Sequence, residues 1–124
     1  MRKTARIILT ASAVAVALGA FTTAPEPATA AEHMSVVEQG KKLAFNRKKG
    51  NCLACHQIEG GELPGNIGPP LVAMKQRFDS KEQIRNQLYN PMVKNPNSIM
   101  PPFGKHNILT NKELDKIVEF VWTL

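Results

Sequence analysis

Hydrophobic and polar residues follow a helical period in three segments of the chain, and no segment shows the sustained alternation of a β-strand. In residues 36–49, apolar or small side chains recur three and four positions apart with charged side chains opposite them. This pattern predicts a first helix, which Gly50 ends. Gly40 lies on its apolar face, and because glycine weakens a helix interior, we expect another helix to cross closely there.

Two further helices are predicted, with loops between them. Residues 81–89 form a short amphipathic segment that Asp79 or Ser80 caps and that Asn90-Pro91 stops. The last helix has the clearest pattern, because Thr110 and Glu113 form a capping box before apolar residues at i, i+3, i+4 and i+7. Residues 59–70 are rich in glycine and proline and are therefore expected to form a loop.

The first 30 residues have the three parts of a secretory signal peptide. Arg2, Lys3 and Arg6 precede an apolar run over residues 7–21, and Ala28-Thr29-Ala30 offers an A-x-A cleavage site. An uncleaved anchor is the alternative, although the run is shorter than the ~20 residues that span a bilayer. We therefore expect a signal peptide at residues 1–30 and one exported domain at 31–124, with no membrane association after the leader is removed.

Charge and cysteine content narrow the class of the exported domain. The full chain has a formal net charge of +6 and only two cysteines. Three basic residues and Glu26 leave with the leader, so the domain is mildly basic and gives no case for nucleic-acid binding. A domain this small buries little surface by itself and needs a further source of stability. If both cysteines bind a cofactor, that source cannot be a disulfide.

Both cysteines belong to the sequence Cys52-Leu53-Ala54-Cys55-His56, and C-x-x-C-H is typical of covalent attachment of a c-type haem. Each thiol adds to a vinyl group of the porphyrin, and the histidine binds the iron. A thioredoxin-like redox pair, half of a zinc site and a disulfide are the alternatives. The first expects a βαβ context and the second needs another ligand pair, and neither is visible in the sequence. One covalent haem c is the favoured interpretation.

The second axial ligand is predicted to be Met100. Pro101 and Pro102 hold its segment extended within a polar loop, where a methionine has little core to fill. Met92 and His106 remain as alternatives. Met74 lies near apolar residues and is expected in the core. A pair of His and Met ligands fills both axial positions, which suits electron transfer.

The proximal histidine needs a partner for its second ring nitrogen, commonly a backbone carbonyl. A carbonyl within residues 68–70 is the predicted acceptor, because Pro69 and Pro70 stiffen the segment that follows the motif.

At this level of detail the chain resembles the class I cytochromes c, and within them the SoxX family. The resemblance covers nearly all of residues 31–124, in the family's order. Its most specific strings, beyond C-x-x-C-H, are Pro64-Gly65-Asn66-Ile67-Gly68-Pro69-Pro70-Leu71 and Met100-Pro101-Pro102-Phe103-Gly104.

This resemblance implies an all-α, class I cytochrome c-like domain of about three to four helices around one covalent haem. It further implies a crossing of the first and last helices at Gly40. The residues that it assigns to haem attachment, iron ligation and haem contact are Cys52 and Cys55, then His56 and Met100, then Pro69, Pro70, Leu71 and Phe103.

The resemblance also implies a role. SoxX is the mono-haem subunit of periplasmic SoxAX complexes, which act as L-cysteine S-thiosulfotransferases and join thiosulfate oxidatively to a carrier-protein cysteine. Such chemistry needs a reactive thiolate, and the haem takes both thiols of this chain. We therefore expect a non-catalytic subunit that receives electrons from a SoxA-type cytochrome and passes them to a soluble acceptor. Residues 67–71 and 100–104, including Phe103, are expected to form its exposed, partner-facing edge.

Two other functions remain open from the sequence. One is a free-standing electron shuttle, steered to acidic partners by basic residues at 41, 42 and 47–49. The other is a gas or redox sensor in which Met100 dissociates from the iron.

Overall fold

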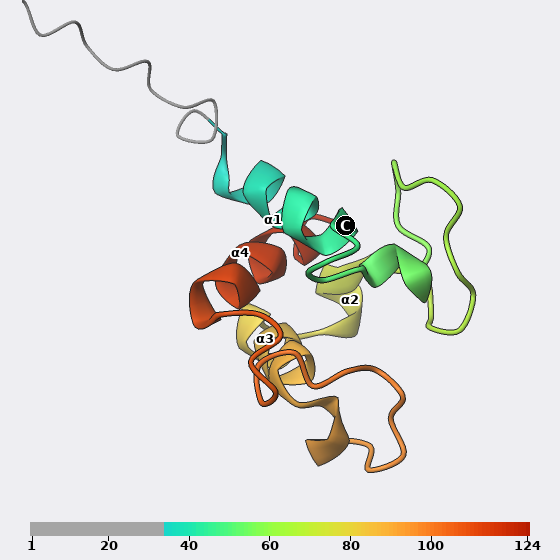
Figure 1. The fold of residues 1–124 in the computed structure, drawn as a ribbon, viewed down its shortest axis with the longest axis vertical. Coiled ribbons are helices and arrows are strands. Elements are labelled where there is room, and N and C mark those ends of the chain that lie inside the picture. The colour runs from blue at the N-terminus through green and yellow to red at the C-terminus, as the bar shows by residue number, and fades with distance from the viewer. Residues whose placement is uncertain (1–33) are drawn as a thin grey trace, which may run out of the picture.

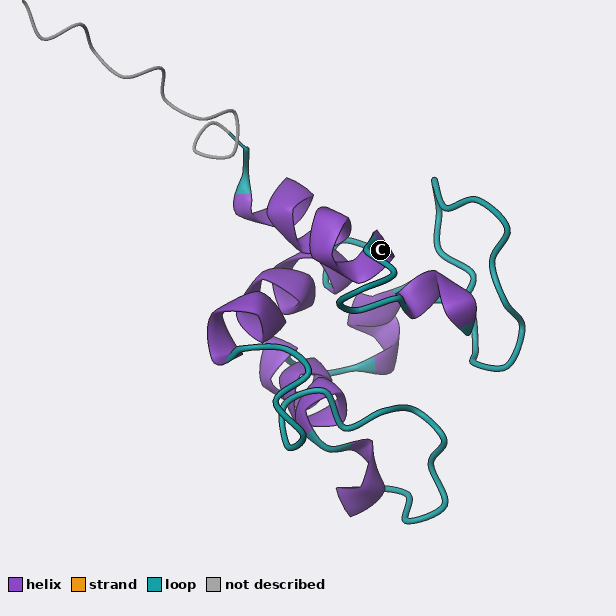
Figure 2. Ribbon diagram, viewed as in Figure 1, coloured by secondary structure: helices purple, strands orange, loops and turns teal. Residues whose placement is uncertain are grey.

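The computed structural model describes residues 34–124, and within them every regular element is a helix or a helical turn (Figures 1 and 2). The predicted signal peptide and the start of the predicted domain at residue 31 lie outside the described residues. The elements, in order, are α1 (Val36–Phe45), the 3-10 turn η1 (Cys52–Ala54), α2 (Met74–Arg77), α3 (Lys81–Tyr89), the 3-10 turn η2 (Pro91–Val93) and α4 (Asn111–Val121). The all-α prediction is confirmed.

Helix α1 begins where the sequence predicts but ends four residues early. Ser35 caps it and forms a reciprocal capping box with Glu38. The helix was expected to reach residue 49, and this is wrong because Asn46 adopts an extended conformation. The Asn46 Oδ1 atom accepts a hydrogen bond from the Lys48 N–H at 2.8 Å, which favours a turn over further helix. Residues 47–50 form this turn and lead into the cysteine motif.

Helices α1 and α4 make the most extensive contact between elements of the described chain. Gly40 lies at their crossing, as predicted, because a side chain there would overlap the backbone carbonyl of Lys116 and the Phe120 Cβ. Phe45 and Phe120 then meet edge to face, with ring centroids 5.9 Å apart. The glycine therefore lets two backbones approach that a larger residue would hold apart.

Helix α3 has the predicted bounds, and both α3 and α4 have predicted caps. Ser80 Oγ accepts from the Gln83 N–H at the start of α3. Thr110 and Glu113 form the predicted capping box of α4. The Glu113 carboxylate also binds Lys49 Nζ at 2.8 Å, and this hydrogen bond, with that from the Thr110 N–H, lowers the pKa of Glu113. The turn after α1 is thus tied to the first turn of α4.

A single hydrophobic cluster joins the helices. It comprises Ala44, Ile58, Met74, Ile84, Leu88, Phe103, Leu109, Leu114, Ile117, Val118, Phe120 and Val121. Every apolar position of the last-helix pattern is buried, and Leu114 and Ile117 are fully enclosed. Met74 is 3 % exposed, so its predicted place in the core is confirmed. Among residues 34–124, no helix is long and apolar enough to cross a bilayer.

We expect Gly40→Val to lower the free energy of unfolding by roughly 1–3 kcal/mol, because the added side chain meets the Lys116 backbone and the helices must separate. Chemical denaturation of the holoprotein measures this. Lys42→Val is the control, since Lys42 is exposed on the same helix. Equal stability of the two variants would contradict the close crossing.

Candidate haem site

The cysteine motif folds as a tight helical turn. Asn51 enters it in the left-handed conformation (φ 48°), which asparagine tolerates better than most residues. The backbone N–H groups of Cys55 and His56 both donate to the Cys52 carbonyl, at 3.2 and 2.9 Å. This turn brings the two thiols and the imidazole into one short segment. Both cysteines are free and half-buried, and burial raises the pKa of the Cys52 thiol to about 11.

His56 is held through one of its two ring nitrogens. The Nδ1 atom lies 2.7 Å from the Pro69 carbonyl oxygen. Since a carbonyl can only accept, Nδ1 carries the proton, and Nε2 keeps a lone pair. This is the tautomer that a metal-binding histidine needs. The prediction of an acceptor within residues 68–70 is confirmed.

The loop that supplies this carbonyl is bonded along the motif. The N–H groups of Gly65, Gly68 and Leu71 donate to the carbonyls of Leu53, Cys55 and Gln57, at 2.8, 2.8 and 2.9 Å. Gly68 also packs directly on the His56 ring, and a Cβ atom there would overlap the ring's Cε1 atom. The glycine and proline residues of this loop therefore form the turn that the sequence predicts. They also allow the loop to pack closely against the histidine ring.

Met100 lies in the second long loop and borders the hydrophobic cluster. Its sulfur is 4.0 Å from Gln87 Nε2, and its N–H donates to Ser98 Oγ at 3.3 Å. The alternatives differ in setting, because Met92 is 38 % exposed and His106 is exposed. Cys52 and Leu71 border the same hydrophobic cluster as Met100. Cys52 from the attachment motif and Met100, the predicted second ligand, thus both pack against the hydrophobic cluster.

The predicted haem-contacting residues occupy different environments. Pro69 and Pro70 are exposed, Leu71 is half-buried, and Phe103 is 7 % exposed. The expectation that Phe103 lies on an exposed, partner-facing edge is wrong. Its carbonyl accepts from the N–H groups of Ile108 and Leu109, which turns its side chain into the core. Ile99, which is 78 % exposed, lies in this loop at the surface instead.

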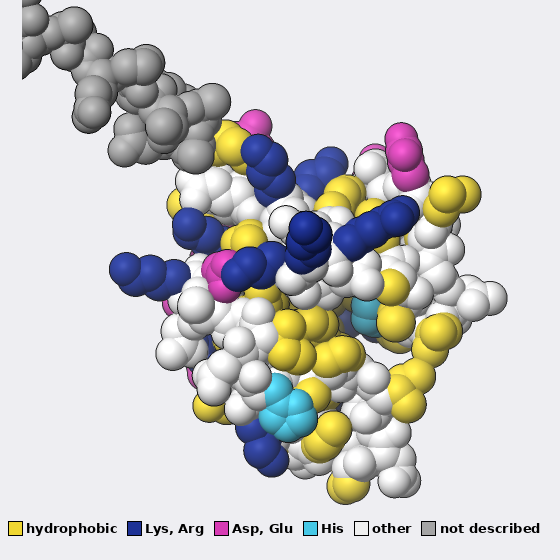
Figure 3. Space-filling view, viewed as in Figure 1, with side chains coloured by type: hydrophobic (Ala, Val, Ile, Leu, Met, Phe, Trp, Pro, Cys, Tyr) yellow, Lys and Arg dark blue, Asp and Glu magenta, His cyan; other side chains and the backbone are white. Residues whose placement is uncertain are grey.

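The composition of this face fits a flat, largely apolar cofactor. Hydrophobic side chains gather on the face shown in Figure 3, beside a band of lysine and arginine side chains. Ile67, Val72 and Ile99 are 64, 53 and 78 % exposed on the loops of this domain. Two thiols, an oriented imidazole and a thioether are the side chains that hold haem c, so the donor set of this chain fits that group.

Arg77 is a site residue that the sequence analysis did not identify. Its Nη1 atom donates to the Pro70 carbonyl at 2.7 Å, next to the carbonyl that holds His56. Gln87 was missed as well, and its amide approaches the Met100 sulfur from α3. Neither has a local sequence signal, because each acts on a residue that a different element positions.

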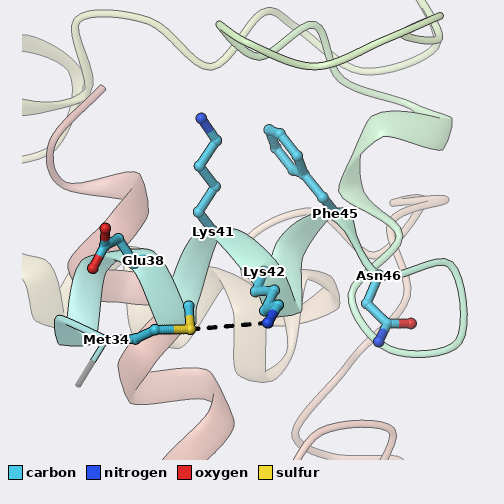
Figure 4. Close-up of a pocket in the computed structure, with 6 residues that line it drawn as sticks. All are labelled: Met34, Glu38, Lys41, Lys42, Phe45 and Asn46. Carbon is cyan, nitrogen blue, oxygen red and sulfur yellow. Dashed lines mark hydrogen bonds between the residues drawn. The ribbon is translucent and has the colours of Figure 1, made fainter. Parts of the chain in front are cut away.

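Two surface hollows are not lined by His56 or Met100, although the second borders the cysteine motif at Leu53 and Ala54. The one in Figure 4, of about 480 Å³, is lined by α1 and its ends, and Lys42 Nζ lies 3.9 Å from the Met34 sulfur there. The second, of about 600 Å³, lies between Phe45 and the loop around Leu63. Within residues 34–124, no group of three or more His, Cys, Asp or Glu side chains is placed to hold a metal ion.

Comparison with known proteins places the chain in a family. The model of the Cytochrome c family matches residues 37–124, and this chain belongs to that family. It is SoxX-like within it: the crystal structure of SoxXA from P. pantotrophus superposes with a TM-score of 0.63 and 28 % identity, over 69 % of this chain and 79 % of that one.

A second relative is an uncharacterized lipoprotein of Aquifex aeolicus (strain VF5), 32 % identical over 95 residues. The match covers 73 % of this chain but 46 % of the lipoprotein, so the chain spans about half the length of this curated relative. The class I cytochrome c fold and an electron-transfer role follow from the family, and membership implies covalently bound haem c.

We expect Gly68→Ala to weaken iron ligation by His56 by about tenfold, because the methyl group displaces the ring from its hydrogen bond. The increase in the high-spin fraction of the ferric protein, seen by visible absorption and electron paramagnetic resonance, measures this. Asn66→Ala is the matched control, because Asn66 is exposed in the same loop. Identical spectra for the two variants would show that the Gly68 contact does not set the ring position.

Proposed function

We propose that this protein is the mono-haem electron-transfer subunit of a periplasmic SoxAX-like complex. The observation that carries the proposal is the His56–Pro69 hydrogen bond within a C-x-x-C-H motif, on a chain similar to a SoxXA structure. The complex would couple thiosulfate oxidatively to a carrier-protein cysteine. This chain would receive the electrons and pass them to a soluble acceptor.

Each site residue has a distinct role in this proposal. Cys52 and Cys55 form the thioether links, His56 binds the iron through Nε2, and Met100 binds it through sulfur. Haem c supplies one-electron redox chemistry when bound. The Pro69 carbonyl keeps the imidazole in one tautomer and raises its basicity. Buried Phe103 helps to anchor the methionine loop, because its N–H donates to the Pro101 carbonyl at 3.0 Å.

The same residues explain why sulfur chemistry belongs to a partner. Sulfur transfer requires a reactive thiolate, and both cysteines of this chain are used for attachment. Two axial ligands also leave no position on the iron for a substrate. The nucleophile is therefore assigned to a SoxA-type cytochrome subunit, and this chain is the non-catalytic member of a heterodimer. The amino-terminal leader would deliver it to the periplasm.

Exposed apolar side chains on the two long loops provide a surface for that partner. Ile67 lies on the first loop, and Val93 and Ile99 on the segment before Met100, at 64, 83 and 78 % exposure. Isolated exposed residues need no explanation, but several on loops that surround the haem site favour a protein contact. An edge at this position would bring the two haems close.

A free-standing electron shuttle is the second candidate, and the band of basic side chains in Figure 3 favours it. Lys41, Lys42, Arg47 and Lys48 are exposed on α1 and the following turn. Such a band attracts acidic partners at low ionic strength. Electron-transfer rates that fall steeply with salt, for a protein purified alone, would support this function over the heterodimer.

We expect Met100→Ala to lower the reduction potential and to open one axial position, because a thioether ligand favours the ferrous state. The reduced variant should bind carbon monoxide rapidly, whereas the wild type should bind it slowly. Redox titration and carbon monoxide difference spectra measure the two effects. Met92→Ala is the control. Rapid binding by the wild type would favour the sensor function, and a variant with unchanged spectra would exclude Met100 as ligand.

We expect Ile99→Asp to reduce recovery of a SoxA-type cytochrome with the tagged holoprotein by about tenfold, because a charge on an interface core residue must be desolvated. Quantitative mass spectrometry of the purified complex measures this. Val36→Asp is the control, because Val36 is 50 % exposed at the start of α1. Equal recovery with both variants would place the interface elsewhere, and a wild-type protein recovered alone would favour the shuttle.

A further inference from the structure

The Pro69-Pro70 segment that binds His56 has no backbone N–H donors of its own. Proline has no N–H group, so residues 69 and 70 contribute only carbonyls to the backbone hydrogen bonds of their loop. The flanking N–H groups of Gly68 and Leu71 are used on the cysteine motif. The Pro69 carbonyl is used on His56, at 2.7 Å. The Pro70 carbonyl is the backbone group between these contacts through which another side chain can further fix the orientation of the segment.

Arg77 binds that carbonyl. Its Nη1 atom donates at 2.7 Å, a short bond from a charged donor, and it also lies 3.8 Å from the sulfur of buried Met74. The guanidinium is planar and stays charged at every physiological pH, so it keeps this bond in one geometry better than a lysine would.

The backbone of Arg77 is itself fixed. Helix α2 begins at Met74, whose side chain is buried and whose N–H donates to the Leu124 carbonyl at 2.9 Å. It ends where the Phe78 N–H returns to the Met74 carbonyl at 3.0 Å. Because the start of this single-turn helix is bound to Leu124 and its backbone bond from Phe78 closes the turn, Arg77 connects the proline segment to the carboxyl-terminal part of the core.

We propose that Arg77 is a positioning residue for the proximal ligand, because it fixes the Pro69-Pro70 segment and so keeps the His56 hydrogen bond short. It acts through the Pro70 carbonyl and does not touch the imidazole. The inference rests on the proposed role of His56 as an iron ligand.

The positioning role and the charge of Arg77 act on the reduction potential in opposite directions. A shorter hydrogen bond at Nδ1 makes the imidazole a stronger donor, which stabilises ferric iron and lowers the potential. A positive charge nearby destabilises ferric iron and raises the potential, although solvent screens it at this exposed position. Removing the positioning effect therefore raises the potential, and removing a charge lowers it.

Arg77→Ala and Lys75→Ala form a matched pair for the test. Both remove one positive charge from α2, and Lys75 is exposed on the same helix. In the ferric holoprotein, proton magnetic resonance follows solvent exchange of the His56 Nδ1 proton, and a redox titration gives the potential. We expect exchange about tenfold faster in Arg77→Ala than in Lys75→Ala, and a higher potential for Arg77→Ala.

Equal exchange rates and equal potentials in the two variants would overturn the proposal. If Arg77→Ala does not assemble, Arg77→Lys replaces it and is compared with the wild type, since it keeps the charge. A higher potential and faster exchange then support the proposal, and wild-type values overturn it. Failure of the underlying ligand assignment looks different, because the wild-type His56 proton would then lack the large shift that a bound ferric iron produces.

Discussion

The contact between α1 and α4 at Gly40 is the constraint on which the rest of the structure depends. Only a residue without a side chain allows the Lys116 backbone to approach so closely. That approach brings Phe45 against Phe120, and it places the end of α1 where the Lys49–Glu113 pair can form. The cysteine motif begins at Cys52, seven residues after α1 ends at Phe45. The position of the haem-binding segment therefore follows from one helix crossing that is formed elsewhere in the chain.

The sequence predicts those parts of the fold whose signals are local. The bounds of α3 follow from Ser80 at one end and Asn90-Pro91 at the other, and the capping box of α4 follows from Thr110 and Glu113. The predicted end of α1 at residue 49 is wrong, because Arg47, Lys48 and Lys49 are acceptable helix residues and give no stop signal. What ends the helix is the Asn46 side chain, whose bond to the Lys48 N–H is invisible in a hydrophobic pattern. Helix α2 was missed because its start depends on a bond to Leu124, fifty residues away in the chain.

In the candidate site, too, the residues with local sequence signals could be predicted and the others could not. The pairing of His56 with a carbonyl of the proline segment could be predicted, because the spacing is short and prolines stiffen an acceptor. Arg77 could not be predicted, since a basic residue seven positions beyond a proline has no pattern of its own. Phe103 shows the opposite error. Its place in a loop suggested exposure, whereas the bonds of Ile108 and Leu109 to its carbonyl fold it inward. The roles of Cys52, Cys55, His56 and Met100 toward the haem stay predictions, to be tested in the holoprotein.

The two prolines beside His56 also bear on how fast an electron can move. Electron transfer slows when bond lengths and ligand orientations must change between the oxidised and reduced states, because that reorganisation adds to the barrier. Proline fixes φ near −65°, so the acceptor of the His56 hydrogen bond has little freedom to follow a change of charge on the iron. In the proposed role of His56 as an iron ligand, a segment held by its prolines and by Arg77 would keep the imidazole in nearly the same position in both oxidation states. With His56 bound to iron as proposed, this rigidity would favour a low inner-sphere reorganisation energy.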